Sequence, residues 1–142
     1  VVWNCNWGQD ACFESHATQP RATLFDNCRG GLVRYHAGGA ENEAPNHLAD
    51  LTLWNLYVTG TTDEKGENFA SDFKWWDAGN IWWKICPPIV VGTHGNAVTF
   101  SKEEGQVTYE ESTGAKVTPE SLYEAQLQNR LGYVPAWLKA LK

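Results

Sequence analysis

Acidic, basic and imidazole side chains alternate along two short stretches of this sequence. The stretches are Phe13-Glu14-Ser15-His16-Ala17 and Val33-Arg34-Tyr35-His36-Ala37, and the second follows the first after 20 residues. Side chains two residues apart on a β-strand face the same side, so stacking the two stretches would gather one polar patch. We predict that this patch is the floor of a substrate groove, with four candidate catalytic residues: Glu14, His16, Arg34 and His36.

A structural role for the same patch is the competing interpretation. Glu14 and Arg34 would then be an ion pair between stacked strands, and the two imidazoles would stack as hydrogen-bonded neighbours. Exposed ion pairs of this kind contribute only about 0–1 kcal/mol to stability. A strand that gives alternate positions to titratable groups favours the functional interpretation.

A polar loop over residues 38–47 is predicted to hang above the patch, and a second loop is predicted over residues 59–72. The first loop carries Glu41, Glu43 and His47. Loops that project from a regular scaffold commonly carry the binding chemistry. We therefore add Glu41 and Glu43 to the candidate catalytic residues and His47 to the candidate substrate-binding residues.

Paired carboxylates suit glycoside hydrolysis, in which one acts as acid and the other as base or nucleophile. Glu41 or Glu43 could form such a pair with Glu14 or with Asp77. The separation of the two carboxyl groups would set the stereochemical course of the reaction.

Elimination from an acidic sugar is the second chemistry that these residues allow. Arg34 or Lys74 could neutralise a uronate or a sulfate while His16 or His36 acts as the base. A metal site built from His16, His36 and Asp77 is a third arrangement, disfavoured because stacked strands seldom bring three ligands to one point. We predict no metal and no cofactor, and hydrolysis and elimination both stay open.

The sequence holds eight tryptophans among 142 residues. Flat indole rings pack protein cores, and they also stack on sugar rings. We predict substrate contacts from four consecutive residues: Lys74, Trp75, Trp76 and Asp77. A carbohydrate-binding domain without catalysis is the alternative function, with ring platforms drawn from Trp54, Trp75, Trp76, Trp82 and Trp83.

A repeat in the first third of the chain indicates the scaffold that would position these residues. Asn4-Cys5 recurs as Asn27-Cys28, 23 residues later. A repeat of this length is typical of one turn of a parallel β-solenoid, whose strands stack about 4.8 Å apart. We predict an all-β parallel β-helix over residues 1–100, with both asparagines at sharp corners in a left-handed backbone conformation.

Alternating and apolar runs place the strands of this scaffold, and Gly30-Gly31 is predicted to be a turn between two of them. The expected strands cover residues 1–7, 11–17, 22–28, 32–37, 51–58, 73–78, 81–86, 89–95 and 97–100.

The repeat fades after residue 100, so residues 101–142 are predicted as a hairpin and turn region followed by a helix. The helix is expected over about 118–131, with Thr118 as N-cap, Pro119 at its first position and Gly132 at its end. We predict that its apolar stripe caps the open edge of the solenoid, which would otherwise recruit another chain.

Composition bounds the partners. The chain is long enough for one domain, and its net charge of -6 argues against nucleic acid. The longest apolar runs are too short to span a membrane. There is no signal-like segment and no methionine, so the sequence reads as a mature or excised piece, the C-terminal part of something longer.

The four cysteines, Cys5, Cys12, Cys28 and Cys86, lack the paired short spacing of a zinc site. Cys5 and Cys28 occupy equivalent repeat positions, where a disulfide is geometrically possible. Two buried free thiols are the favoured alternative.

Several segments together make the chain resemble the C-terminal portion of bacterial right-handed parallel β-helix proteins from polysaccharide-degradation gene clusters. The resembling segments are Cys12-Phe13-Glu14-Ser15-His16, Leu24-Phe25-Asp26-Asn27-Cys28, Arg34-Tyr35-His36-Ala37-Gly38-Gly39, Pro45-Asn46-His47-Leu48 and Leu51-Thr52-Leu53-Trp54-Asn55. Residues 119–127 are similar to the closing helix of such proteins.

The resemblance implies a secreted, cell-surface or periplasmic bacterial protein that binds and cleaves an acidic or sulfated polysaccharide, as a glycoside hydrolase or a polysaccharide lyase. It also implies further rungs ahead of this segment, with part or all of a catalytic cleft among them. A structural cap that only closes a longer solenoid is the remaining alternative.

Overall fold

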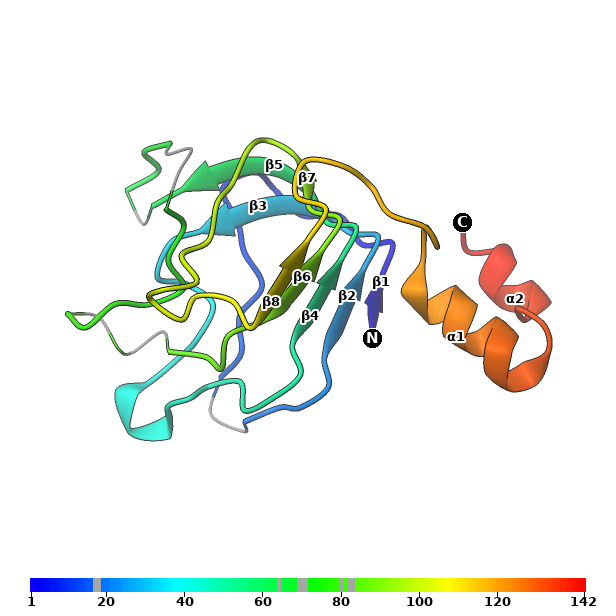
Figure 1. Cartoon of the computed structure of the whole chain (residues 1–142), viewed down its shortest axis with the longest axis horizontal. Coiled ribbons are helices and arrows are strands. Elements are labelled where there is room, and N and C mark those ends of the chain that lie inside the picture. The colour runs from blue at the N-terminus through cyan, green and yellow to red at the C-terminus, as the bar shows by residue number, and fades with distance from the viewer. Residues whose placement is uncertain (17–18, 64, 69–71, 80, 82–83) are drawn as a thin grey trace.

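The computed structural model describes residues 1–16, 19–63, 65–68, 72–79, 81 and 84–142. Five strands form one parallel sheet in chain order, which we call sheet A (Figure 1). Its strands are β1 (Val2–Trp3), β2 (Leu24–Asp26), β4 (Thr52–Trp54), β6 (Ile89–Val91) and β8 (Tyr109–Glu111).

A second parallel sheet, sheet B, lies at an angle to sheet A and borders the core together with it (Figure 1). It contains β3 (Arg29–Val33), β5 (Tyr57–Thr62) and β7 (His94–Gly95). Successive passes of the chain through sheet A stack on one another, and we call each pass a rung. The fold is therefore mostly strands in parallel sheets and solenoid-like.

The register of the first two rungs confirms the repeat that the sequence shows. Val2 pairs with Phe25, which preserves the 23-residue spacing of the Asn-Cys pairs. Later pairings of Phe25 with Leu53 and of Leu53 with Val90 have wider spacings. The loops between rungs differ in length, so the repeat is visible in the sequence only at its start.

A column of sharp corners follows the strands of sheet A. Each strand is followed at once by a residue with positive φ, and these residues are Asn4, Asn27, Asn55, Gly92 and Ser112. The N–H of each of the first four donates to a carbonyl of the next rung, as Asn4 does to Asp26 at 3.0 Å. Asn27 Nδ2 also donates to Asn4 Oδ1 at 2.8 Å. The predicted corner role of both asparagines is confirmed.

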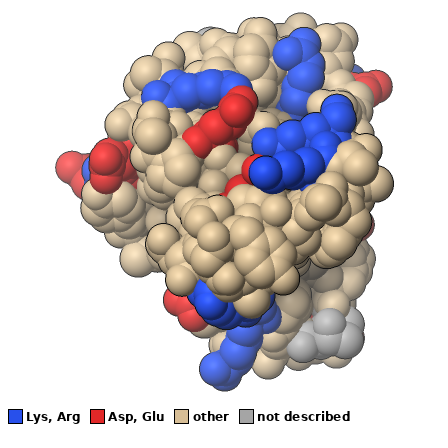
Figure 2. All heavy atoms as spheres, turned by 90° about the vertical axis from the view of Figure 1, so that its right-hand side faces the viewer, with Lys and Arg blue, Asp and Glu red and all other residues tan. Residues whose placement is uncertain are grey.

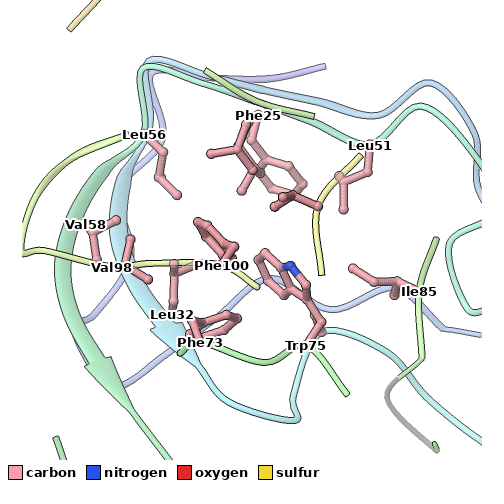
Figure 3. Packing of buried hydrophobic residues seen from close by; sticks show 14 of the residues in the cluster. Phe25, Leu32, Leu51, Leu56, Val58, Phe73, Trp75, Ile85, Val98 and Phe100 are labelled. Carbon is pink, nitrogen blue, oxygen red and sulfur yellow. The ribbon is translucent and has the colours of Figure 1, made fainter. Parts of the chain in front are cut away.

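The core lies between the two sheets and is filled by aromatic and branched side chains (Figure 3). Phe25 lies on the sheet A side, and Leu32 and Val58 come from sheet B. Trp75 and Phe100 stack at 5.7 Å between ring centroids in the middle of this cluster. Residues 73–100 therefore contribute to the core even where they form no strand.

The Gly30-Gly31 pair lies inside β3, so the predicted turn is wrong. A Cβ on Gly30 would come within 2.1 Å of the Trp7 ring, and a Cβ on Gly31 would come within 2.1 Å of the Gln9 carbonyl oxygen. The two glycines are thus places where residues 7–9 pack directly onto a strand.

Several predicted strands are not strands in the described part of the chain. Residues 11–16, 73–79 and 84–86 have no strand, and Phe73 makes only an isolated bridge to Phe100. Conversely, β5 runs on to Thr62 into the predicted second loop. The strand β8 adds to sheet A in parallel, so the repeat continues beyond residue 100.

The helical end of the chain comprises α1 (Leu122–Leu131) and α2 (Ala136–Lys139), and a short 3-10 turn, η1 (Glu41–Glu43), lies in the first long loop. Gly132 ends α1 as predicted, with φ of 80°. The N-cap is Ser121 rather than Thr118. The carbonyls of Pro119 and Glu120 accept hydrogen bonds from side chains of the third rung, so the backbone there is not helical.

Residues 112–121, which we call the strap, run back across the column of corners. Gly114 N donates to Thr93 O in the fourth rung. Asn55 in the third rung donates through Nδ2 to Val117 O at 2.9 Å and accepts from Val117 N through Oδ1 at 2.8 Å. Ser121 reaches Asp26 in the second rung. The strap thereby connects the last rungs to the first.

The strap delivers α1 to the side of sheet A on which β1 lies (Figure 1). The buried Asp26 carboxylate accepts from Ser121 Oγ at 2.5 Å and from the backbone N–H groups of Leu122 and Tyr123, both at 3.0 Å. Acidic and basic side chains are interspersed on the face that carries the helices (Figure 2). One of the ion pairs there joins Lys142 to Glu124 at 2.7 Å.

All four cysteines are free thiols, so no disulfide joins Cys5 to Cys28. Cys28 is buried as expected, whereas Cys5 is exposed. Burial raises the pKa of Cys12 to about 12. Among the described residues, no helix is both long and apolar enough to cross a membrane.

Candidate active site

Glu14 joins two histidines in a small polar cluster. Its Oε2 lies 2.9 Å from His16 Nε2, and its Oε1 lies 2.5 Å from His36 Nε2. An ionised carboxylate can only accept, so each imidazole donates a hydrogen bond to it through Nε2–H. The Glu14 side chain is 37% exposed and that of His36 is 39% exposed, so substrate can reach both groups.

Packing of Phe13 explains why Glu14 faces the opposite way. The Phe13 ring stacks on Phe25 at 4.3 Å and lies 5.7 Å from Trp75. Ser15 N donates to Ala37 O at 2.9 Å and holds this segment against the chain that follows β3. The extended segment therefore buries Phe13 and presents Glu14 on the opposite side, beside His36. The repeat in the sequence had instead placed Glu14 over Arg34.

Next to this cluster lies a cleft of about 630 Å³, which we call the histidine cleft. Its charged and titratable lining comprises Asp10, Cys12, His36, Asp63 and Lys65. Glu14 contacts the cleft through His36. The cleft thus combines an imidazole held by a carboxylate, two further carboxylates and one ammonium group.

Asp63 is fixed in the wall of the histidine cleft by the turn that follows β5. Its Oδ1 accepts from the backbone N–H groups of Glu67 at 2.9 Å and Lys65 at 2.8 Å. These hydrogen bonds, that of Glu67 foremost, lower the pKa of Asp63. The carboxylate therefore stays ionised over the neutral pH range.

Arg34 directly follows β3. Its contacts are with Asp72 and Tyr35 rather than with Glu14. Its Nη2 donates to Asp72 O at 2.7 Å, and its guanidinium lies 5.7 Å from the centroid of the Tyr35 ring. Glu14 binds the two histidines instead of forming the inter-rung ion pair with Arg34 that the competing structural interpretation required. The stacking offset of 20 residues is also not realised, because Ser15 is hydrogen-bonded to Ala37.

A second cleft, of about 590 Å³, lies beside Trp76, and we call it the tryptophan cleft. Its lining includes Lys74, Trp76, Asp77 and Glu104. Lys74 and Glu104 are paired at 2.9 Å. The Lys84 ammonium lies 4.7 Å from the centroid of the Trp76 ring, so this ring borders the cleft with a cation over it.

Asp77 is held in the tryptophan cleft by two hydrogen bonds. Tyr35 OH donates to Asp77 Oδ2 at 2.5 Å, and Gly79 N donates to Oδ1 at 2.8 Å. Desolvation and this hydrogen bond to Asp77 raise the pKa of Tyr35 to about 12. Tyr35 therefore remains a neutral hydrogen-bond donor. Asp77 is bound to Tyr35, whereas Glu14 is bound to His16 and His36, so the two carboxylates belong to separate clusters.

Two predicted substrate-binding residues are buried, which corrects their assignment. Trp75 and His47 both have 0% exposure, and Trp75 is part of the aromatic core. A fully buried indole ring cannot stack on a sugar ring, so Trp75 has a structural role in the core. The predicted platforms Trp82 and Trp83 lie outside the described residues.

Glu41 and Glu43 lie on η1, away from the lining of the histidine cleft as the described residues define it. Glu43 O accepts from Gln19 Nε2 at 3.3 Å. Sequence reasoning missed Asp10, Asp63 and Lys65 as parts of the site. An Asp three residues before Gly66 is a turn signal, and it shows how Asp63 could have been recognised.

The described residues contain no group of three or more His, Cys, Asp or Glu side chains arranged to hold a metal ion. The arrangement as a whole offers proton transfer and charge recognition: an oriented imidazole, ionised carboxylates and an ammonium group around one cleft.

Fold and site define a solenoid-like domain of parallel sheets with a cleft beside sheet B that is lined by titratable side chains. Residues 1–141 match DUF4955, a domain of unknown function, and the chain belongs to this family. No curated protein and no solved structure matches the chain.

Proposed function

We propose that this domain binds an acidic polysaccharide in the histidine cleft and cleaves it by β-elimination. The observation that carries the proposal is the 2.5 Å contact between Glu14 and His36 at a cleft that also holds Lys65. We further propose that the stacked rungs belong to a right-handed parallel β-helix of a secreted bacterial carbohydrate-active protein, in which such clefts bind long polymers.

The Glu14 contact sets the role of His36. His36 Nε2–H donates a hydrogen bond to Glu14. In the neutral imidazole the other ring nitrogen, Nδ1, then carries no proton, and it is the atom that can accept one. The negative charge of Glu14 also stabilises the imidazolium that forms when it does so. His36 is therefore the base, and Glu14 is the positioning residue.

Lys65 supplies the charge that elimination requires. Its ammonium group would pair with the carboxylate of a uronate and make the neighbouring C5 proton easier to remove. The C5–H bond breaks and its electron pair forms the C4=C5 double bond while the C4–O bond to the leaving sugar breaks. The proton held on His36 then passes to the leaving oxygen, which completes the reaction without a co-reactant.

The test incubates the protein with neutral, uronic and sulfated polysaccharides and follows the absorbance of unsaturated products together with new reducing ends. We expect unsaturated ends from a uronic polymer, and a decrease of at least about 100-fold in rate for His36→Gln. Glu14→Gln should lower the rate and shift its pH profile, whereas Glu103→Gln, an exposed change away from the lining of the histidine cleft, is the matched control. Reducing ends without unsaturation would instead establish hydrolysis by the carboxylates.

Binding without cleavage is a second candidate function, favoured by the tryptophan cleft. Trp76, Asp77 and the Lys74–Glu104 pair combine an aromatic wall with hydrogen-bonding groups, which is how many proteins recognise sugars. In this case polysaccharides would change the tryptophan fluorescence but yield no product. Glu104→Ala would weaken this binding, and His36→Gln would leave it unchanged.

A further inference from the structure

A third cleft adjoins the histidine cleft along β5. It has a volume of about 470 Å³, and we call it the amide cleft. Thr59, Gly60 and Thr61 line the amide cleft, and Thr62 and Asp63 continue into the histidine cleft. On the opposite wall, Gln9 lines the amide cleft and Asp10 lines the histidine cleft. Because both walls pass from one cleft to the next within one residue, the two clefts lie end to end.

The two clefts differ in their chemistry. The histidine cleft is lined by Asp10, Asp63, Lys65 and His36. Among the described residues, the lining of the amide cleft contains no ionisable group, and its polar side chains are the amides and hydroxyls of Gln9, Thr59, Thr61, Asn68 and Asn96. Amides and hydroxyls both donate and accept, which suits the hydroxyl groups of an uncharged sugar.

The wall that the two clefts share is held firmly in place. Gly31 N donates to Gly8 O at 3.0 Å, and a Cβ on Gly60 would come within 3.1 Å of Gln9 O. On the other side, Asn96 Nδ2 donates to Thr59 O at 3.0 Å. Thr59 Oγ1 is buried in this wall without a hydrogen-bond partner. The amide cleft is therefore pre-formed, and it keeps one polar group unsatisfied.

We propose that the two clefts form one site for a glycan in which an acidic sugar is followed by an uncharged sugar. The acidic unit lies against Lys65 and His36, and the uncharged unit lies in the amide cleft against Gln9 and Asn96. This inference rests on the proposed function, since it names the composition of the polymer that the histidine cleft cleaves. A sugar bearing a carboxylate in the amide cleft would lose its hydration without meeting a cation.

Binding of three tetrasaccharides tests the inference by calorimetric titration. The probes are chondroitin tetrasaccharide, in which glucuronate alternates with an uncharged amino sugar, tetragalacturonate, which is acidic at every unit, and cellotetraose, which is neutral. Glu14→Gln is the background, because it slows turnover and lies outside both linings. We expect the alternating probe to bind at least about 10-fold more tightly than either of the others.

Two substitutions separate the clefts. Gln9→Ala should weaken the alternating probe about 3- to 10-fold, the loss of one or two hydrogen bonds, and should leave tetragalacturonate unchanged. Lys65→Ala should weaken both acidic probes. The matched controls are Gln126→Ala, on the exposed face of α1, and Lys102→Ala, also exposed; neither should change any affinity.

Equal binding of the two acidic probes, or an equal effect of Gln9→Ala on both, would overturn the two-unit site. Lys65-dependent binding and cleavage would survive that outcome, so the proposed function would stand. If neither acidic probe binds, and no uronic polymer yields product, both proposals fail together.

Discussion

His47 is a polar side chain in an apolar place. It is fully buried, and neither of its ring nitrogens has a hydrogen-bond partner among the described residues. Burial lowers the pKa of this imidazole, so it is neutral in the folded protein at neutral pH. His47 was predicted to bind substrate because it ends a polar loop. Burial of its unpaired ring nitrogens lowers the stability of the folded protein.

Replacing His47 by leucine should therefore stabilise the protein. Removing two unpaired buried polar atoms at similar volume should raise the free energy of unfolding by about 1 kcal/mol. The pH dependence should change as well, because the unfolded chain takes up a proton near pH 6.5 that folded His47 does not, and this lowers stability as the pH falls. Urea unfolding at several pH values between 7 and 5 measures both effects.

His16→Gln is the control for that experiment, because it removes an exposed histidine and keeps His47. A His47→Leu protein that is less stable than the wild type, with an unchanged slope against pH, would show that the imidazole has a partner in solution.

At the scale of elements, Asp26 decides where α1 lies. Ten residues are too few for an isolated helix to be stable in water. The Asp26 carboxylate and the Ser121 hydroxyl together accept hydrogen bonds from the first N–H groups of α1. A negative charge at a helix N-terminus also interacts favourably with the helix dipole. The second rung thus adds a buried carboxylate to the cap that Ser121 provides.

Asp26→Ala should release α1 from sheet A. We expect a loss of about 3 kcal/mol in the free energy of unfolding, since three hydrogen bonds to one carboxylate disappear and buried donors are left behind. Amide hydrogen exchange should show faster exchange over 122–131 than in β4 or β6. Glu103→Ala, an exposed change, should stay within about 0.5 kcal/mol of the wild type. Unchanged protection of α1 in Asp26→Ala would contradict the capping role.

The elements that sequence reasoning placed correctly are those with strong local signals. Asn4 and Asn27 mark corners because asparagine tolerates positive φ, and Gly132 ends α1 for a similar reason. The errors arose where tertiary packing decides. Gly30-Gly31 looks like a turn, yet the absent side chains make room for Trp7 and Gln9.

Prediction of the site also succeeded where local sequence signals decide and failed where tertiary packing decides. The proximity of Glu14 and His16 follows from alternation, so it was accessible to sequence reasoning. His36 joins them through a register that differs from the 20-residue offset, because Ser15 is hydrogen-bonded to Ala37. The cleft residues Asp63 and Lys65 come from a loop whose position only the fold determines. Trp75 was misassigned because periodicity cannot distinguish an indole in the core from one in a groove.

At the scale of the whole molecule, the strap makes distant rungs depend on one another. In a solenoid each rung contacts only its neighbours, so the ends can unfold separately. Here residues 112–121 contact the fourth, third and second rungs in turn, through Thr93, Asn55 and Asp26. Loss of the strap would therefore expose unsatisfied groups in three rungs at once.

Asn55→Gly tests this coupling. Gly92 occupies the same corner position in the next rung, so glycine suits the backbone while the contacts of the Asn55 side chain with the strap disappear. We expect a loss of about 2–4 kcal/mol in the free energy of unfolding. Hydrogen exchange should show residues 115–121 opening before the strands.

Asn27→Gly is the matched control, since it removes a side chain from the same column but only the bond to Asn4. Its loss should be about 1 kcal/mol. Equal losses in the two variants would show that the strap does not couple the rungs.

The strap also fixes how this domain can change in length during evolution. An extra rung inserted between β2 and β8 would move Asp26 about 4.8 Å further from the strap, beyond reach of its 2.5 Å bond to Ser121. Such an insertion would need a compensating change in residues 112–121. A rung stacked outside β1 would leave the contacts of Thr93, Asn55 and Asp26 intact. Gain and loss of rungs should therefore be easier on the side of β1, where an added rung would have to be accommodated beside α1.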